Sequence, residues 1–377
     1  MPLRRPRVSR RSRRQGGRSA GWLLAGLIVF SVGFIGARLL PREAQSPATR
    51  ATALPVTPAP TAAAPTTKAS PPAAAPKVTF TPPPAPEPAS AFPRPVNTWL
   101  EVQVELARRL FSCGPIDGVG GAQTGAALRA FQENEGLPVT GQLDTATRTT
   151  LLLTAPTHRP YTVTADDLAG LEPVRPTWLG KSQQTSLAHE TVLERLAERF
   201  HAHPNHLRAL NPGTDWATLA AGATVLVTAV ERPRARLAAA NVHIRLAERI
   251  LQIRDPQSRI IAHFPVSIAR NVDKRPVGEL RVTVVVPDPN YTFNPEVFPE
   301  SAEGRELGRK LILPPGPNNP VGVAWIGLNL PGYGIHGTPV PEQVGRTESH
   351  GCFRLANWDA RTLLDLAWVG LPVFVDP

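Results

Sequence analysis

Residues 349–355 read Ser-His-Gly-Cys-Phe-Arg-Leu, and this stretch decides which fold and which chemistry the sequence predicts. A second motif, Gly-Ile-His-Gly-Thr, occupies residues 334–338, so that His336 lies fourteen residues before His350. A cysteine that follows a glycine, with a histidine on a neighbouring segment, suits acyl transfer by a thiol. The glycine lets a carbonyl approach the backbone, and the imidazole removes the thiol proton. Cys352 is therefore the candidate nucleophile and His336 the candidate general base.

The two motifs together closely resemble the signature of the L,D-transpeptidases of the bacterial cell wall, the YkuD-type catalytic domain. The resemblance covers residues 238–377 and implies a mostly β domain, with the motifs on adjacent strands or at their ends. It also implies that Cys352 attacks the third residue of a peptidoglycan stem peptide and releases the terminal D-alanine. Transfer of the resulting thioester to an amine then forms a 3→3 cross-link, without a cofactor or a metal.

Other outcomes of the same chemistry stay open, because the sequence does not specify the acceptor. Interception of the thioester by water makes the enzyme an L,D-carboxypeptidase, and interception by a lysine of a lipoprotein attaches that protein to the wall. A hypothesis of a different class is a non-catalytic wall-binding protein that retains an inactive domain. Cys352 and His336 are both present, which argues against that hypothesis.

The residues next to the base and the nucleophile have expected supporting roles. We expect the backbone carbonyl of Gly337 to orient the His336 imidazole. The backbone N–H groups of His350, Gly351 and Cys352 are candidate oxyanion donors, since Gly351 tolerates unusual dihedral angles. The His350 side chain is an alternative general base.

Arg354 lies two residues after the cysteine and shares its face if the segment is extended. A guanidinium there can bind a substrate carboxylate through two hydrogen bonds. The alternative is a structural salt bridge from Arg354 to Asp359 or Glu348. Ser349 is expected to hydrogen-bond within the loop or to the substrate.

The formal net charge of +11 belongs mainly to residues 1–20, which hold eight arginines and no acidic residue. A nucleic-acid partner is therefore not expected. The apolar run at 21–40 is long enough to cross a ~30 Å hydrocarbon core as a helix, and the arginines place its N-terminal side in the cytoplasm. We expect a membrane signal-anchor at 21–40, with the catalytic domain in the periplasm or extracytoplasmic space; a cleaved secretory signal is the alternative.

Residues 41–96 form a linker rich in proline and alanine, which we expect to be disordered, because it has few large apolar side chains to bury. Helical patterns follow near 102–110, 124–131 and 144–153, with turn-rich stretches between them. The motifs GPIDG, TxxALxxFQ and GLxxxG make residues 97–155 resemble a small three-helix peptidoglycan-binding domain. Glycan strands are the partner that this resemblance implies.

Residues 160–230 combine two helical patterns, the sequence LNPG and a closing strand, which resembles a lysin motif of βααβ form. About 25 residues separate the expected first strand from the first helix, which is longer than the usual pattern. Within the segment, His201, His203 and His206 have spacing that suggests a metal site. We expect them instead to be solvent-exposed histidines between two short helices.

The C-terminal third is rich in β-branched runs, which predict strands at 241–246, 259–264, 280–286, 321–326 and 372–375. A short helix is expected near 358–367, and residues 287–320 form a long insertion that is a candidate lid or substrate wall above the cysteine. The predicted fold class is thus multidomain α+β, with the mostly β domain preceded by the three-helix and βααβ units.

Cys113 is expected to be a buried or unpaired thiol rather than a disulfide partner of Cys352.

Overall fold

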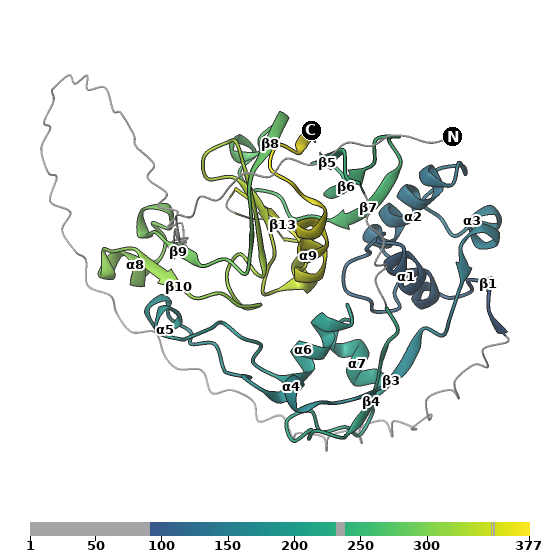
Figure 1. The fold of residues 1–377 in the computed structure, drawn as a ribbon, viewed down its shortest axis with the longest axis horizontal. Coiled ribbons are helices and arrows are strands. Elements are labelled where there is room, and N and C mark those ends of the chain that lie inside the picture. Colours follow the sequence, from purple (N-terminus) through teal and green to yellow (C-terminus); the bar gives the residue numbers. More distant parts are fainter. Residues whose placement is uncertain (1–90, 231–237, 348, 350) are drawn as a thin grey trace, which may run out of the picture. The chain divides into compact units, whose positions relative to one another are not determined.

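The computed structural model describes residues 91–230, 238–347, 349 and 351–377, all of which belong to one unit of the chain, Thr61–Pro377 (Figure 1). The predicted basic tail, the membrane segment at 21–40 and most of the linker lie outside these residues. Among the described residues, no helix has the length and apolar character needed to cross a bilayer.

The helical domain, residues 97–155, begins at a threonine that caps its first helix, α1 (Trp99–Arg108). The Thr98 hydroxyl accepts from the Glu101 N–H, and the Glu101 carboxylate accepts from the Thr98 N–H, which together form a capping box. Helices α2 (Ala122–Asn134) and α3 (Thr145–Thr150) complete the predicted set of three. Their buried side chains form one core, which includes Val102, Leu106, Leu128, Phe131 and Leu151.

Two predicted boundaries of this domain are wrong. Strand β1 (Arg94–Pro95) pairs antiparallel with β2 (Leu152–Leu153), so the folded chain begins before the predicted linker end at residue 96. The third helix ends at Thr150 and not at residue 153. The physical reason is that Leu151 and Leu153 are fully buried in the domain core, while the backbone there pairs with the incoming chain.

The middle module, residues 160–230 in the sequence prediction, has the expected strand–helix–helix–strand core. Strand β3 (His158–Thr162) pairs antiparallel with β4 (Thr224–Thr228), and α6 (Val192–Arg199) and α7 (Pro204–Leu210) pack against them. The long segment between β3 and α6 contains two short helices, α4 (Ala165–Leu168) and α5 (Trp178–Ser182).

His201, His203 and His206 are half-buried rather than solvent-exposed, so that expectation is wrong. His203 caps α7 by accepting from the Asn205 N–H. The His206 Nε2 atom lies 3.3 Å from the Nε2 atom of His158, and the His201 ring stacks on Trp358. Among the residues described by the structure, no group of three or more metal-ligating side chains is found.

The C-terminal domain, residues 238–377, is built on an eight-stranded mixed sheet with strand order β13-β12-β11-β8-β14-β5-β6-β7. The strands are β5 (Asn241–Arg245), β6 (Ile250–Arg254), β7 (Ile260–Pro265), β8 (Gly278–Pro287), β11 (Ala324–Leu328), β12 (Gly334–His336), β13 (Phe353–Arg354) and β14 (Pro372–Asp376). The predicted strand at 321–326 is shifted, because β11 begins at Ala324. Strand β6 was not predicted.

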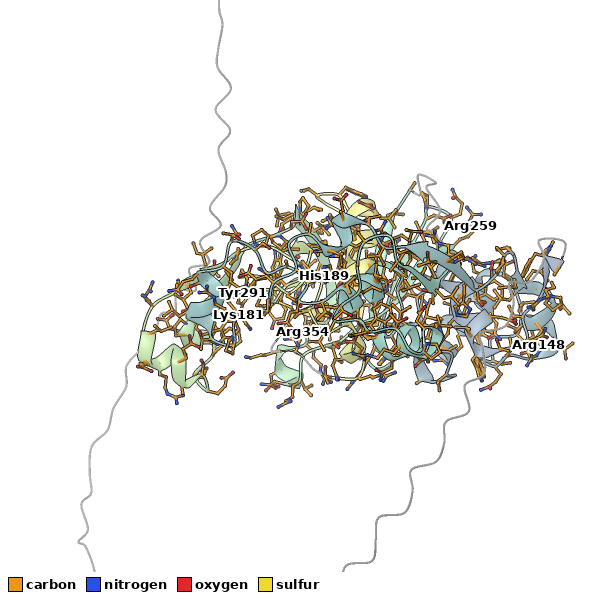
Figure 2. The ribbon with its side chains drawn as sticks, turned by 90° about the horizontal axis from the view of Figure 1, so that it is seen from below. Arg148, Lys181, His189, Arg259, Tyr291 and Arg354 are labelled. Carbon is orange, nitrogen blue, oxygen red and sulfur yellow. The ribbon has the colours of Figure 1, made fainter. Side chains whose placement is uncertain are left out.

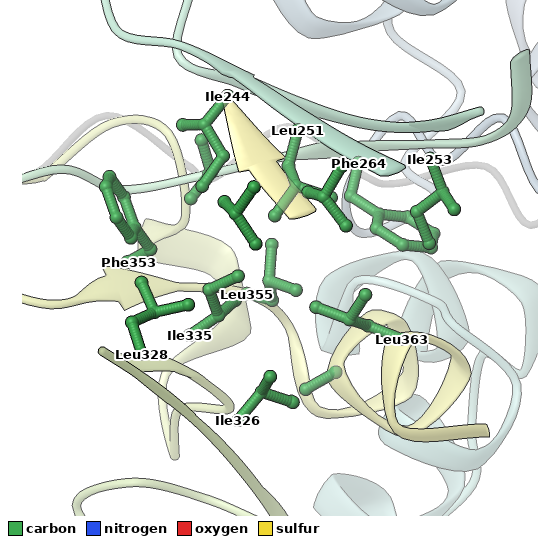
Figure 3. Close-up of a cluster of buried hydrophobic side chains, with 14 of the residues drawn as sticks. Ile244, Leu251, Ile253, Phe264, Ile326, Leu328, Ile335, Phe353, Leu355 and Leu363 are labelled. Atoms are coloured by element: carbon green, nitrogen blue, oxygen red, sulfur yellow. The ribbon is translucent and has the colours of Figure 1, made fainter. Parts of the chain in front are cut away.

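Helix α9 (Asn357–Leu366) packs against the sheet, and side chains from both form the largest core cluster. Figure 3 shows part of it, including Ile244, Leu251, Phe264, Ile335, Phe353 and Leu363. The helical domain covers the edge of β7, where the His263 N–H donates to the Leu110 carbonyl and the Ser112 N–H donates to the His263 carbonyl. The edge strand is thereby protected from pairing with another chain.

The insertion between β8 and β11 has its own structure. It contains β9 (Tyr291–Phe293), the 3₁₀ helix η3 (Pro295–Val297), α8 (Ala302–Leu307) and β10 (Leu311–Leu313), with β9 and β10 paired antiparallel. Two further 3₁₀ helices, η2 (Val272–Lys274) and η4 (Pro341–Gln343), lie in loops of the domain.

Helix α5 of the middle module docks on this insertion, which accounts for the unusual length between β3 and α6. The Trp178 ring stacks on Phe293 with 4.3 Å between centroids and 14° between planes. The Glu303 carboxylate of α8 accepts from the backbone N–H groups of Trp178 and Leu179, at 2.8 Å each.

We predict that Glu303→Ala loosens the insertion without unfolding the chain. The substitution leaves two N–H groups at the start of α5 without their acceptor, a loss of about 1–3 kcal/mol of local stability. Hydrogen exchange should show faster exchange in residues 291–313 and 178–182. The matched control is Glu306→Ala on the exposed side of the same helix; equal exchange in the two variants would contradict the docking role of Glu303.

Candidate active site

The two sequence motifs lie on adjacent strands, as predicted. Strands β12 and β13 pair in parallel, with Ile335 opposite Phe353 and His336 opposite Arg354. Ile335 and Phe353 point into the core (Figure 3). Because successive side chains of a strand alternate between its faces, His336 and Arg354 lie on the opposite face of the sheet. Cys352 lies in the bend directly before β13, close enough to Arg354 for their charges to interact.

A tryptophan and a glycine shape this face of the sheet. Trp325 on β11 is paired with His336, and the two rings stack with 5.7 Å between centroids and 22° between planes. A Cβ atom at Gly334 would lie 2.7 Å from the Trp325 ring, so the indole requires a glycine there. Trp325 thereby limits how the His336 imidazole can turn.

The His336 imidazole is held by the carbonyl group that the sequence analysis suggested. Its Nδ1 atom lies 2.6 Å from the Gly337 carbonyl oxygen. Because a carbonyl can only accept, Nδ1 carries the proton and Nε2 is left as the basic atom. Burial lowers the pKa of His336 to about 4; the hydrogen bond to Gly337 opposes this shift and the charge of Arg354 adds to it. The imidazole is therefore neutral, and able to accept a proton, at neutral pH.

The Cys352 thiol is half-buried and unpaired. Its Sγ atom donates to the Gly332 carbonyl at 3.5 Å. Burial raises the pKa of the Cys352 thiol, while a hydrogen bond from the Gly334 backbone and the charge of Arg354 act in the opposite direction. No hydrogen bond joins the described side chains of Cys352 and His336 in this structure. Catalytic hydrogen bonds of this kind often form only when the substrate is bound.

The Ser349 side chain forms two hydrogen bonds within the loop that contains the cysteine. Its hydroxyl donates to the Cys352 carbonyl at 2.6 Å and accepts from the Gly351 N–H at 3.2 Å. The Gly351 N–H is thus engaged within the loop in this structure, and its expected role as an oxyanion donor stays a prediction. A Cβ atom there would meet nothing within 4 Å, so the space beside Gly351 is open.

Arg354 forms no ion pair with any carboxylate among the described residues. The expected structural salt bridge from Arg354 to Asp359 is therefore absent from them. The Asp359 carboxylate instead accepts from the Ser112 hydroxyl at 2.9 Å. Burial lowers the pKa of Arg354, and the negative charges of Cys352 and Tyr291 oppose that shift. The guanidinium is therefore partly desolvated beside the nucleophile. Glu348 and His350 lie outside the described residues, so their expected roles stay predictions.

Two tyrosines lie near the cysteine; the first belongs to the insertion that was expected above it, and the second was missed by the sequence analysis. Tyr291 comes from β9 of the insertion and is marked with Arg354 in Figure 2, and Tyr333 comes from the loop between β11 and β12. Burial raises the pKa of each hydroxyl, and a negative charge on Cys352 raises it further. The insertion was expected to lie above the cysteine, but no spacing in it singles out Tyr291 as the residue that folds back on the site.

Cys113 is remote from this chemistry. Its side chain is buried in the helical domain, and both cysteines are free thiols in this structure. Burial raises the pKa of the Cys113 thiol to about 12. A thiol reagent at neutral pH should therefore report on Cys352 with little contribution from Cys113.

We predict that stability falls as the pH drops from 6.5 towards 4. The pKa values of His336 and His158 are lowered to about 4, and that of His263 to about 3. Each imidazole binds a proton in the unfolded chain before it does so in the folded chain, so folding is fully favoured only above pH 6.5. His336 alone should contribute roughly 1–3 kcal/mol to the loss.

Urea unfolding of the full-length protein between pH 7 and pH 4 measures this dependence. The variant His336→Gln cannot take up the proton, so its free energy of unfolding should change less steeply over the same range. An equal slope in the variant would contradict the buried, neutral state of His336.

Comparisons with known proteins assign families to two of the regions described above. Residues 240–375 match the YkuD model, an L,D-transpeptidase catalytic domain, and residues 96–151 match a peptidoglycan binding domain. These matches cover the helical domain and the C-terminal domain. The lysin-motif assignment of the middle module stays a prediction.

Curated relatives carry related names. "Putative L,D-transpeptidase YkuD" of Bacillus licheniformis is 24% identical over 49% of this chain and 94% of its own length. "Probable L,D-transpeptidase YbiS" of Escherichia coli K12 is 29% identical over 49% of this chain and 60% of its own length. A solved L,D-transpeptidase from Xylanimonas cellulosilytica aligns over 78% of this chain and 99% of its own, at 16% identity. Its TM-score is 0.32, too low to establish a shared fold by itself.

Proposed function

We propose, from the premise that residues 240–375 are an L,D-transpeptidase catalytic domain, that this chain cross-links peptidoglycan stem peptides through a thioester on Cys352. The observation that carries the proposal is the pairing of His336 with Arg354 across β12 and β13, with Cys352 in the bend directly before β13 and the His336 Nδ1 atom held by the Gly337 carbonyl. The Arg354 cation thus lies near both the basic imidazole and the thiol.

In the first step, the Cys352 sulfur attacks the carbonyl of the third stem-peptide residue, and Nε2 of His336 takes the thiol proton. Collapse of the tetrahedral intermediate breaks the bond to the terminal D-alanine, and His336 returns the proton to its departing amine. An amine of a second stem peptide then attacks the thioester. His336 accepts the proton of that amine, the sulfur leaves, and the 3→3 cross-link is formed.

The surrounding residues would support these steps in distinct ways. The Gly351 N–H is engaged by Ser349, and no hydrogen bond described for this loop uses the Cys352 N–H, so we assign the oxyanion to the Cys352 N–H. Arg354 would hold a carboxylate of the substrate and favour the thiolate through its charge. Tyr291 and Tyr333 would form walls beside the acyl group.

The remaining parts of the chain would deliver the active site to the wall. The peptidoglycan-binding domain raises the local concentration of stem peptides without adding contacts at the cysteine. A signal-anchor at 21–40 and the linker after it would hold the enzyme at the membrane, with catalysis outside the cytoplasm. A cleaved signal would release the same enzyme.

Incubation of the full-length protein with a purified disaccharide-tetrapeptide tests the proposal. Release of D-alanine together with a cross-linked dimer is the expected result. Release of D-alanine with tripeptide alone would replace the proposal by an L,D-carboxypeptidase, and transfer only to an added lipoprotein would make the enzyme an attaching transpeptidase. Binding to sacculi without any release would favour the non-catalytic wall-binding protein.

A further inference from the structure

A carboxylate of the middle module contacts an asparagine that is hydrogen-bonded to the backbone next to His336. Glu198 lies on α6, and its Oε2 atom accepts from the Nδ2 group of Asn357 at 2.9 Å. Asn357 begins α9 of the C-terminal domain and is 1% exposed. The same Nδ2 group also donates to the Pro317 carbonyl at 3.1 Å. Both acceptors therefore fix which way the Asn357 amide points.

The oxygen of that amide holds the backbone next to His336. Oδ1 of Asn357 accepts from the Thr338 N–H at 3.1 Å and from the Val323 N–H at 3.4 Å. A Cβ atom at Gly337 would lie 2.2 Å from this oxygen, so only a glycine at position 337 leaves room for the Asn357 amide.

One peptide group connects the two contacts. The Thr338 N–H that Asn357 holds and the Gly337 carbonyl that holds His336 Nδ1 belong to the same planar peptide unit. Fixing the N–H side of that plane fixes the direction of its carbonyl. The direction of the carbonyl in turn sets the position and the tautomer of the imidazole.

The Glu198 carboxylate is itself held within the middle module. Its Oε1 atom lies 3.6 Å from Nε2 of His189, and Nδ1 of His189 accepts from Arg195 at 3.4 Å. Figure 2 marks His189. Without the Glu198 carboxylate, the Nδ2 group of Asn357 loses one of its two acceptors, and these acceptors distinguish the nitrogen of the amide from its oxygen.

We infer that Glu198 is a positioning residue for His336, supplied to the catalytic domain by the middle module. The inference rests on the proposed role of His336 as the general base. It gives the middle module a part in catalysis that does not depend on glycan binding.

The test compares Glu198→Leu and Glu198→Gln in the full-length protein. Glu198 lines a cavity of about 500 Å³, so leucine has room in place of the carboxylate. Leucine removes the acceptor, whereas glutamine retains an oxygen for the Asn357 amide. We expect kcat to fall about tenfold or more in Glu198→Leu with little change in KM, because misplacing a catalytic group by small distances has effects of this size. Glu198→Gln should retain most of the activity.

Alkylation of Cys352 by iodoacetamide provides a readout that needs no peptidoglycan substrate. In Glu198→Leu the pH profile of alkylation should move to higher pH, because the thiol loses the assistance of a correctly placed His336. The matched control is Glu194→Leu, which removes a carboxylate on the same helix that accepts from Asn318 at 2.7 Å. This control should melt at a lower temperature but keep the wild-type pH profile.

The two Glu198 variants and the control separate the outcomes. A wild-type profile and kcat in Glu198→Leu would overturn the inference, and so would an equal shift in Glu194→Leu, since any docking contact would then suffice. If Glu198→Leu does not fold, Glu198→Ala serves in its place with the same expected shift. A shifted profile in a protein that releases no D-alanine would refute the proposed function and leave the positioning role intact.

Discussion

Replacing Cys352 by alanine should reduce release of D-alanine to the uncatalysed background, a loss of at least about 10³-fold, because covalent catalysis ends with the nucleophile. The fold should persist, since Cys352 is half-buried and its sulfur makes one hydrogen bond to Gly332 at 3.5 Å. Release of D-alanine from a disaccharide-tetrapeptide by the full-length protein measures the effect.

The second cysteine of the chain provides the matched control for this prediction. Cys113 is a free thiol buried in the helical domain, and Cys113→Ser should keep the wild-type rate at a slightly lower melting temperature. Persistent turnover in Cys352→Ala, or equal losses in the two variants, would be incompatible with Cys352 as the nucleophile.

The variant His336→Asn should lower kcat by about 10²–10⁴-fold, which is the usual contribution of a general base. The pKa of His336, about 4, implies that the base is already neutral throughout the neutral range. The acid limb of the kcat/KM profile should therefore lie near pH 4 and not near 6.5 in the wild-type protein.

A histidine elsewhere in the sheet tests whether this loss is specific. His243 lies on β5 and pairs with β6 and β14, and His243→Asn should retain the wild-type rate. If His336→Asn remains within threefold of wild type while His350→Asn loses activity, the base is His350. That result would reverse the assignment made between the two histidines.

The sequence was sufficient to predict the features that depend on short motifs. The family resemblance of the two motifs that contain His336 and Cys352 implied adjacent strands or strand ends, and the structure pairs β12 with β13. The three helices of the helical domain follow from local capping and apolar spacing, both of which a short window of sequence contains.

The features that were missed depend on contacts between distant parts of the chain. The insertion was expected above Cys352, but the sequence does not single out Tyr291 within it, and it contains no sign that Glu198 meets Asn357. These pairs are separated by 61 and 159 residues. The third helix was predicted too long because apolar periodicity does not distinguish a last helical turn from a strand that pairs with Arg94–Pro95. The hydrogen bond from the Gly351 N–H to Ser349 was likewise not predicted, because only the loop geometry reveals it.

The central claim is that Cys352 carries the acyl group, and intact-mass measurement of the full-length protein after brief exposure to disaccharide-tetrapeptide tests it most directly. We expect a mass increase equal to the substrate minus D-alanine, located on the peptide that contains Cys352 and removed by hydroxylamine. Cys113→Ser should show the same adduct and Cys352→Ala should show none. Release of D-alanine by the wild-type protein without any adduct, even after rapid quenching, or an adduct located elsewhere, would contradict the account.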